Sequence, residues 1–549
     1  MAELVLGPVL RYVGETEAVV WVETDEPCVV AVLDAEARTF GVQGHHYALV
    51  VIEGLEPGRT YEYQVVIDGE RRWPAYASEF PPSAIRTLAG SGPVRIAYGS
   101  CRIALPHRAP YTLSHDDHPD GREYDALYTL AHELWGRPRE TWPDILLLLG
   151  DQVYADEGAP ETRAFIRSRR DTSVPPGEEV ADFEEYTALY RESWGDPVIR
   201  WLLSTVSCSM VIDDHDVHDD WNISRSWVDE MRRQPWWERR EAGALASYWV
   251  YQFVGNLSPE ALGENQLFQE VRELDDAGER LREFGDRERD LADGERWSYC
   301  RDLNGSRLVV LDDRTGRVLE EGSRDIFDEA EWEWLKSHIE GEWNHLLIAT
   351  SDPFLLAPGL HHVESWGEAL VEGAWGRRAA AWGERLRRRL DFDHFAAFRR
   401  SFDRLVSVLR DHGSGGHGHP PASIGFLSGD VHHAYFAEAA YPRADGVRSV
   451  VWQGVCSPFR NALNRQSRAV IRFGNSKMGE AIGHTLARAA GVRSPRIRWR
   501  LVEGPFYDNQ IATLSLDGRA AELKLERTTG DPQLDKRQLV TSFERRLVG

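Results

Sequence analysis

The chain divides into two regions by its pattern of hydrophobic and polar positions. In residues 1–88, short runs such as EAVVWVET, CVVAVL, HHYALVVIEGL and TYEYQVVIDGE are separated by turn residues and have no helical period, which predicts strands. From residue 94, strand-like runs alternate with stretches such as YDALYTLAHELWG and FDHFAAFRRSFDRLVSVLRDHG. Their apolar residues recur at spacings of three and four, the second ending at Gly413, and predict helices. Proline, glycine and serine in residues 81–93 predict a linker.

The first region is predicted to be a β-sandwich. In LEPGRTYEYQV, a proline–glycine turn leads into a strand through Tyr61. This order of residues is similar to the tyrosine corner of immunoglobulin-like and fibronectin-like sandwiches. Another small all-β domain is the alternative.

The second region, residues 94–530, is predicted to be an α/β domain. Its stretch 160–295 is charged, aromatic and mostly helical in composition, and we interpret it as an insertion or cap. Hairpins are expected around Asn304-Gly305 and at Asp517-Gly518, because these pairs favour tight turns. Residues 531–549 are interpreted as a C-terminal tail.

Five short apolar runs in the second region end in side chains that bind metals or transfer protons. Gly-Asp after a strand is ordinary turn chemistry, so one such run carries little information. Ligands of α/β proteins bind where the carboxyl ends of strands meet, and five runs of this kind predict one shared site. The runs are VRIAYGSC, DILLLLGDQVYAD, SMVIDDHDVHDD, HLLIATSDP and IGFLSGDVHH, which deliver Cys101, Asp151, Tyr154, Asp156, Asp213, Asp214, His215, Asp216, Asp352, Asp430, His432 and His433.

These residue types limit the chemistry of the site. Carboxylates, one phenol, one thiol and few histidines suit hard or trivalent cations better than a structural zinc, which favours four Cys/His ligands. A central carboxylate such as Asp151 can bridge two cations about 3.5–4 Å apart, and such a pair clamps a phosphoryl group and activates a water. His215, among acids, would be basic enough to donate a proton to a leaving alkoxide.

The motifs GSC, GDQVYAD, IDDHDVHDDWN and SGDVHHAY, in this order, resemble the PhoD-like alkaline phosphatases of the calcineurin-like metallophosphoesterase superfamily. The resemblance covers residues 90 to 530 approximately, and the β-sandwich in front also looks like the N-terminal domain of that family. It implies a four-layer α/β/β/α core and hydrolysis of phosphate esters by a water or hydroxide held on the metals. Phosphomonoesterase and phosphodiesterase activity both stay open, because the 160–295 stretch could provide or block room for a second ester arm.

The resemblance also implies a role for each motif residue. Asp151 would bridge the two metals, and Tyr154 and the thiolate of Cys101 would bind a ferric ion. Asp214 stands where the superfamily has the asparagine of its GNH motif and would bind the second metal. His215 matches the histidine of that motif and would contact phosphate as the catalytic residue.

The pair Asp430 and His432 matches the GHxH motif, with aspartate in place of the first histidine, and both are predicted metal ligands. His433 is interpreted as a neighbour. The VxxH histidine of the superfamily has no counterpart, and Asp352 is the candidate at that strand end, with helix capping as its alternative role.

Three other side chains are secondary candidates. Arg102 could bind the phosphate of a substrate. Asn222 could complete a coordination shell or cap a turn, and Asp216 could bind metal or support a ligand.

The same comparison predicts the metals. Asp214, Asp430 and Asp352 stand where zinc- and manganese-binding relatives have neutral ligands, so the second position is oxygen-rich and favours calcium, with manganese or magnesium as alternatives. Phenolate and thiolate donate charge well to a ferric ion. The expected content is one iron with one or two calcium ions.

Composition and charge exclude some partners. The 549 residues are 42% hydrophobic and 28% charged, with a net charge of −25, which argues against general binding of nucleic acid. No window approaches the ~18 apolar residues needed to span a bilayer, so no membrane partner is expected, and a small phosphate ester is the expected substrate. The five scattered cysteines and the lack of a leader favour the cytoplasm, although the family is often exported. A non-catalytic cation-binding or interaction protein, with the sandwich as its binding module, is the alternative function.

Overall fold

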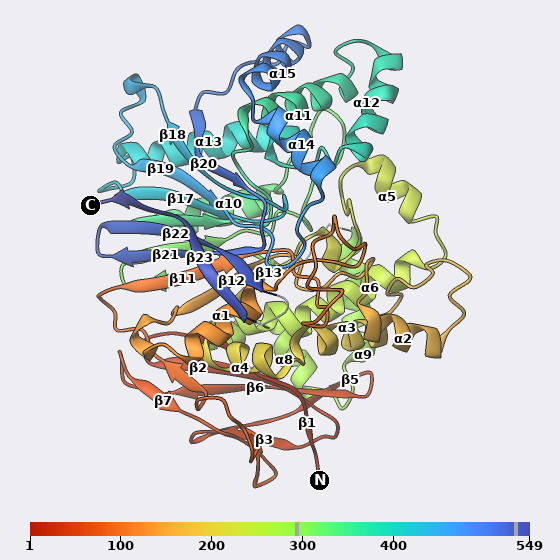
Figure 1. Cartoon of the computed structure of the whole chain (residues 1–549), viewed down its shortest axis with the longest axis vertical. Helices are drawn as coiled ribbons and strands as arrows, with labels where there is room; N and C mark the ends of the chain where they lie inside the picture. Colours follow the sequence, from red (N-terminus) through yellow and green to blue (C-terminus); the bar gives the residue numbers. More distant parts are fainter. Residues whose placement is uncertain (291–295, 532–535) are drawn as a thin grey trace.

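The structure, a computed structural model, describes residues 1–290, 296–531 and 536–549 (Figure 1). Residues 291–295 of the predicted insertion and 532–535 of the predicted tail lie outside the described residues. The mixed α/β class predicted from the sequence is confirmed: several sheets are surrounded by helices.

Two four-stranded sheets form the N-terminal region, and their facing sides share one buried cluster that includes Val20, Val30, Val50 and Ile67. The hydroxyl of Tyr61 accepts a hydrogen bond from the backbone N–H of Glu56 at 2.8 Å, which agrees with a tyrosine corner. The sheet orders are β1-β2-β6-β5 and β4-β3-β8-β9, with β1 Leu4–Val13, β2 Glu17–Thr24, β3 Val29–Val32, β4 Ala35–Arg38, β5 Phe40–Val42, β6 His45–Glu53, β8 Val65–Ile67 and β9 Glu70–Trp73.

The boundary of this region differs from the prediction. The segment TYEYQVVIDGE contains two strands, β7 (Thr60–Glu62) and β8, and β7 pairs with β10 (Ala84–Arg86). The predicted linker 81–93 therefore contributes a strand. Its apolar residues Ala84 and Ile85 are buried, which explains why a proline- and glycine-rich stretch is still ordered.

A six-stranded sheet follows, in the order β13-β12-β11-β21-β22-β23. Its first three strands are parallel, and β12 is fully buried, as parallel strands covered on both faces are. The prediction of residues 531–549 as a tail is wrong, because most of this segment forms β23, which pairs along its length with β22. The strands are β11 Val94–Gly99, β12 Ile145–Leu149, β13 Ser207–Val211, β21 Gln510–Asp517, β22 Ala520–Asp531 and β23 Lys536–Val548.

A seven-stranded sheet, in the order β14-β15-β16-β17-β19-β18-β20, packs against the six-stranded sheet. One buried cluster joins Leu147 and Leu149 of the first sheet to Leu347 and Trp452 of the second. Strands β15, β16, β17 and β19 are parallel neighbours. The strands are β14 Tyr299–Leu303, β15 Ser306–Val310, β16 His345–Ala349, β17 Ser423–Ser428, β18 Ala434–Ala440, β19 Val450–Val455 and β20 Arg498–Phe506.

Both predicted hairpins are present. Asn304 and Gly305 connect β14 to β15 with φ angles of 47° and 86°, the left-handed conformation that a two-residue turn requires. Asp517 pairs with Ala520 across the turn between β21 and β22.

Helices pack on the outer faces of the two sheets. On the seven-stranded sheet, α10 (Glu329–Ile339) and α13 (Arg399–Ser414) bury residues such as Trp332 and Leu405. Helix α13 is shorter at its start than predicted, because residues 395–397 form a 3₁₀ turn, and it ends at Gly415 in the left-handed conformation. The other helices here are α11 Pro358–Val371, α12 Arg377–Arg389, α14 Arg465–Gly474 and α15 Lys477–Ala489.

The 160–295 stretch is not a separate insertion. It contains β13, and its helices share one buried cluster with α1 (Ala126–Trp135) and with the N-terminal sheet. The ring of Trp21 on β2 lies 6.1 Å from that of Trp194 on α3, edge to face. The helices are α2 Pro160–Arg169, α3 Phe183–Trp194, α4 Pro197–Thr205, α5 Arg225–Met231, α6 Trp237–Ser247, α7 Pro259–Glu264, α8 Gln266–Glu273 and α9 Gly278–Asp290, with a π-helical segment, Tyr248–Phe253, after α6.

Among the described residues, none of the helices is both long and apolar enough to cross a bilayer.

Candidate metal centre

The five strand ends identified in the sequence belong to two sheets. Cys101, Asp151 and Asp213 follow the parallel strands β11, β12 and β13, whereas Asp352 and Asp430 follow β16 and β17. Because the two sheets pack face to face, the loops at these strand ends meet at one edge of the pair. Four groups of potential ligands form there, each with ligand atoms within 4.8 Å of one another.

Four predicted ligands have left-handed backbone conformations. The φ angles are 57° at Cys101, 51° at Asp151, 62° at Asp430 and 50° at His432. Residues other than glycine rarely adopt this region, at a cost of about 1–3 kcal/mol, and such strain gathers at functional sites. The chain leaves each strand with a sharp bend that directs the side chain into the shared edge.

Two glycines allow the loops to approach. Gly150 has φ 91°, and a Cβ there would lie 2.3 Å from the Cβ of Asp213. A Cβ at Gly429 would lie 2.2 Å from the hydroxyl of Ser100. The glycine of each Gly-Asp pair is therefore needed for close contact between strand ends, in addition to its turn geometry.

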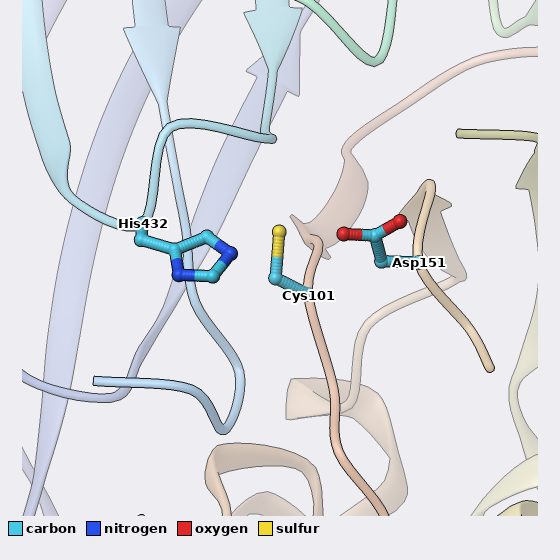
Figure 2. Close-up of side chains that lie close together, drawn as sticks. All are labelled: Cys101, Asp151 and His432. Carbon is cyan, nitrogen blue, oxygen red and sulfur yellow. The ribbon is translucent and has the colours of Figure 1, made fainter. Parts of the chain in front are cut away.

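The first group consists of Cys101, Asp151 and His432. Figure 2 shows the sulfur of Cys101 between the imidazole of His432 and the carboxylate of Asp151. The hydroxyl of Tyr154 donates to Oδ2 of Asp151 at 3.0 Å and accepts from the side-chain amide of Asn461 at 3.2 Å. A thiol, a phenol, a carboxylate and an imidazole thus converge in one buried place.

The second group shares Asp151 with the first and adds Asp213, Asp214 and Asp430. Oδ1 of Asp151, Oδ2 of Asp213 and Oδ1 of Asp214 are buried without a hydrogen-bond donor among the described residues. Such carboxylate oxygens are costly to bury. Carboxylates so close together are stabilised by positive charge, so their arrangement fits bound cations.

Burial and repulsion between carboxylates also shift the pKa values of Asp151 and Cys101. Burial, together with Asp214, Asp216 and Asp430, raises the pKa of Asp151 well above its usual value. Burial and nearby carboxylates likewise raise the pKa of the Cys101 thiol. Without a positive charge these groups would hold protons, and a bound cation would displace them.

His215 forms a third group with Asp151 and Asp214, and its side chain is partly exposed. Its Nδ1 is 2.9 Å from both carboxylate oxygens of Asp156, and its ring lies 4.5 Å from that of Tyr154. Burial would lower the pKa of His215, but Asp156, Asp214 and Asp151 raise it well above its usual value. Asp156 therefore fixes the ring through Nδ1, and Nε2 lies 3.7 Å from the carboxylate of Asp219.

Several secondary candidates have other contacts in the structure. Asp352 forms the fourth group with His394 and Asp430. It also accepts from Arg314 at 2.9 Å with one carboxylate oxygen and from Arg317 at 2.6 Å with the other, so it is a buried ion-pair partner. The prediction that Arg102 binds substrate is wrong, because its guanidinium is buried and donates to Asp125 and to the carbonyl of Ser193.

The remaining candidates support the loops. Asn222 donates to the carbonyl of Arg314 at 3.1 Å. His433 is buried, with Nδ1 2.7 Å from the carbonyl of Val431, and lies outside the four groups, as predicted for a neighbour.

The sequence interpretation missed two important residues. Arg314 follows β15 and is buried among carboxylates, bonding Asp213 at 2.6 Å as well as Asp352 and Asp393. The run RLVVLDDR has the same pattern as the five that were used, a strand followed by acids, and could have indicated it. His394 lies 3.2 Å from Asp430 and 3.0 Å from Glu364. It stands in a segment predicted as helix, and no signal in the sequence marks it.

Asp216 connects the site to the N-terminal region. It accepts from the backbone N–H groups of Asp151 at 3.2 Å and Asp213 at 3.0 Å, and from the side-chain amide of Gln252 at 3.1 Å. Gln252 lies in the π-helical segment, and its carbonyl accepts from Arg11 of β1. A continuous chain of hydrogen bonds thus runs from the first strand to the loops that carry the candidate ligands.

Comparisons with known proteins agree with this geometry. Residues 122–271 match the family model "PhoD-like phosphatase", and residues 1–85 match a domain of unknown function, DUF7800. A solved structure described as "Structure of PhoD" superposes with a TM-score of 0.61 and 12% identity, covering 100% of this chain and 91% of that one. These matches confirm the resemblance to the PhoD-like family and show a shared fold.

Other comparisons add nothing to this picture. A maltogenic amylase from S. marinus has 10% identity and a TM-score of 0.17 over 97% of this chain and 80% of its own, too low to support an argument. No curated protein matches the chain.

Replacement of Gln252 tests whether the hydrogen-bond chain positions the ligands. We expect Gln252→Leu to weaken cation binding by about 10–100-fold, because Asp216 loses a donor and no longer fixes the two loops. Isothermal titration of metal-depleted protein measures the affinity, and the exposed Gln266→Leu is the matched control. Unchanged affinity in a folded Gln252→Leu variant would contradict this role.

Proposed function

We propose that this PhoD-like protein hydrolyses phosphate esters at the edge where β11, β12, β13 and β17 end. The observation that carries the proposal is the convergence there of Cys101, Asp151, Asp214, Asp430 and His432. Five ligand-type side chains at the ends of four strands, with buried oxygens that lack a hydrogen-bond donor among the described residues, are typical of a two-cation phosphoesterase. The fold shared with PhoD supports the same function.

Two cation positions follow from the first and second of the four groups of ligands. Cys101, Tyr154, Asp151 and His432 would hold the first cation, and we assign it to ferric iron because phenolate and thiolate donate charge strongly. The second position, with oxygens from Asp151 and the carboxylates Asp213, Asp214 and Asp430, would hold calcium, or manganese or magnesium instead. When bound, such cations clamp a phosphoryl group and lower the pKa of a water to about 7.

His215 would contact the phosphate and donate a proton to the leaving group. Asp156 orients its ring through Nδ1, so the proton to be transferred sits on Nε2. The carboxylates around it favour the protonated ring, which suits a general acid. Asp216 would act on Asp151 through backbone hydrogen bonds rather than as a ligand.

The domain arrangement completes the proposal. The two facing sheets and the helices outside them would form the four-layer α/β/β/α core, which begins at β11 and includes β23, preceded by the sandwich of residues 1–88. A small phosphate ester is the proposed substrate. The five cysteines are unpaired, which supports a reducing compartment such as the cytoplasm.

A cation-binding protein without catalysis is the alternative. It is favoured by the buried ion pairs of Asp352, which resemble a structural network more than a catalytic one. It predicts metal binding without turnover, so the assay below separates the two functions.

The test is turnover of chromogenic esters by protein loaded with iron and calcium. We expect hydrolysis of a phosphomonoester, a phosphodiester or both. Asp151→Asn should lose metal and activity together, because it removes the shared anionic ligand, whereas the exposed Asp34→Asn should keep both. Loaded protein that turns over neither ester would leave only the cation-binding function.

His215→Ala separates proton transfer from metal binding. We expect kcat to fall by about 10²–10⁴-fold while metal content stays near normal, because His215 donates a proton and does not hold the cations. Steady-state kinetics and elemental analysis of the same preparation measure the two effects. Near-normal turnover in this variant would assign the proton donor to another group.

Tyr154→Phe tests the identity of the first cation. A tyrosinate bound to ferric iron absorbs visible light, so concentrated protein should be coloured and the variant bleached, with Tyr111→Phe as a control. Visible absorption spectra and elemental analysis check this. Active protein with two zinc ions and no iron would overturn the metal assignment while leaving the esterase function intact.

A further inference from the structure

A face of α12 presents tryptophan and arginine to solvent. Arg378, Trp382, Arg385 and Arg389 recur at spacings of three and four, so they follow one side of the helix. Trp375 lies just before the helix and, like Trp382, is close to the ring of Trp366. We call Trp375 and these four helical residues the Trp–Arg face. The two tryptophans are 45% and 50% exposed. All three arginines are exposed.

Helix α15 presents an aliphatic stripe at the same end of the molecule. Gly479, Gly483 and Ala487 are buried, and a Cβ at Gly483 would lie 2.6 Å from the carbonyl of Gly359 on α11. Small residues thus dock α15 closely against α11. Its other side exposes the aliphatic stripe, which consists of Met478, Ala481, Ile482 and Thr485.

The Trp–Arg face and the aliphatic stripe belong to one structural unit. The indole N–H of Trp375 donates to the carbonyl of Ala489, at the end of α15, at 3.2 Å. Trp366 of α11 lies 5.8 Å from Trp375 and 6.0 Å from Trp382, ring to ring. Figure 1 shows α11, α12, α14 and α15 together at the end opposite the N-terminal sheets.

Helices α12, α14 and α15 carry a surplus of basic residues, whereas the whole chain is acidic. Residues 377–389 contain six arginines and one glutamate, and residues 465–489 contain five arginines or lysines and one glutamate, in a chain of net charge −25. The same helices expose Met478 by 60% and Ile482 by 46%. Exposed apolar side chains beside a local basic surplus are the features of a helix that lies on an anionic bilayer.

We propose that this end of the protein docks on an anionic lipid surface, with the aliphatic stripe entering the acyl boundary and the Trp–Arg face lying at the headgroups. Tryptophan prefers that depth because one edge of its ring is polar, and arginine binds phosphate. Nucleic acid would pair with the arginines but offers no apolar phase for Met478 and Ile482, so lipid is the better partner. Surface docking needs no membrane-spanning segment, so the expectation of no membrane partner is revised.

Vesicle binding tests the proposal. Full-length protein should co-sediment with phosphatidylcholine vesicles that contain phosphatidylglycerol, less so at high salt, and much less with phosphatidylcholine alone. The double variant Arg378→Glu and Arg385→Glu should bind at least about tenfold more weakly, since each basic residue contributes at an anionic surface. The charge-matched control, Arg38→Glu on β4 and Arg59→Glu in the turn before β7, should bind like the parent.

A second pair of variants tests insertion. Met478→Gln with Ile482→Gln should weaken binding at unchanged charge, and brominated lipids should quench the tryptophan fluorescence of the parent more than that of Trp375→Phe with Trp382→Phe. Circular dichroism checks that each variant is folded. The proposal is overturned if the parent ignores anionic vesicles, if it binds duplex DNA in preference to them, or if the Glu variants only abolish a dimer. Phosphoesterase activity does not enter these measurements, so the proposed function can fail independently.

Discussion

The repulsion among buried carboxylates is the constraint on which the arrangement of the site depends. Asp151, Asp213, Asp214 and Asp430 meet within a few ångströms, and such a group is stable only with protons or positive charge among them. Arg314 supplies one fixed charge, bonded to Asp213. Its guanidinium also lies 3.8 Å from Oδ1 of Asp214 and 3.5 Å from Oδ1 of Asp430, so one arginine offsets part of the repulsion among these carboxylates.

Hydrogen bonds from the N-terminal region and the π-helical segment also support the loops of the candidate site. Asp216 fixes the backbone of two ligand loops, Gln252 holds Asp216, and Arg11 reaches Gln252 from the first strand of the N-terminal region. The N-terminal sheets also share a hydrophobic core with the helices of residues 160–290. These sheets therefore support the framework around the candidate site.

Much of the site could be predicted because the information is local. An apolar run followed by Gly-Asp predicts a buried strand and its end, so Asp151 and Asp430 could be identified as candidates without a structure. Arg314 and His394 were missed because their partners lie far away in the chain; Arg314 and Asp213 are separated by 101 residues. Arg102 was assigned to substrate for the related reason that a linear pattern does not give the direction of a side chain.

The sequence by itself determined the chemical inventory: hard-cation ligands at the ends of buried strands, a histidine among acids, and an all-β region before an α/β region. Each of these depends on residues adjacent in the chain. The tertiary structure decided which carboxylates accept hydrogen bonds from arginine, as Asp352 does, and which keep buried oxygens without a hydrogen-bond donor among the described residues, as Asp151 and Asp214 do. It also decided that residues 160–290 belong to the core. These outcomes depend on distance and burial between segments far apart in sequence, because electrostatic and packing energies act through space.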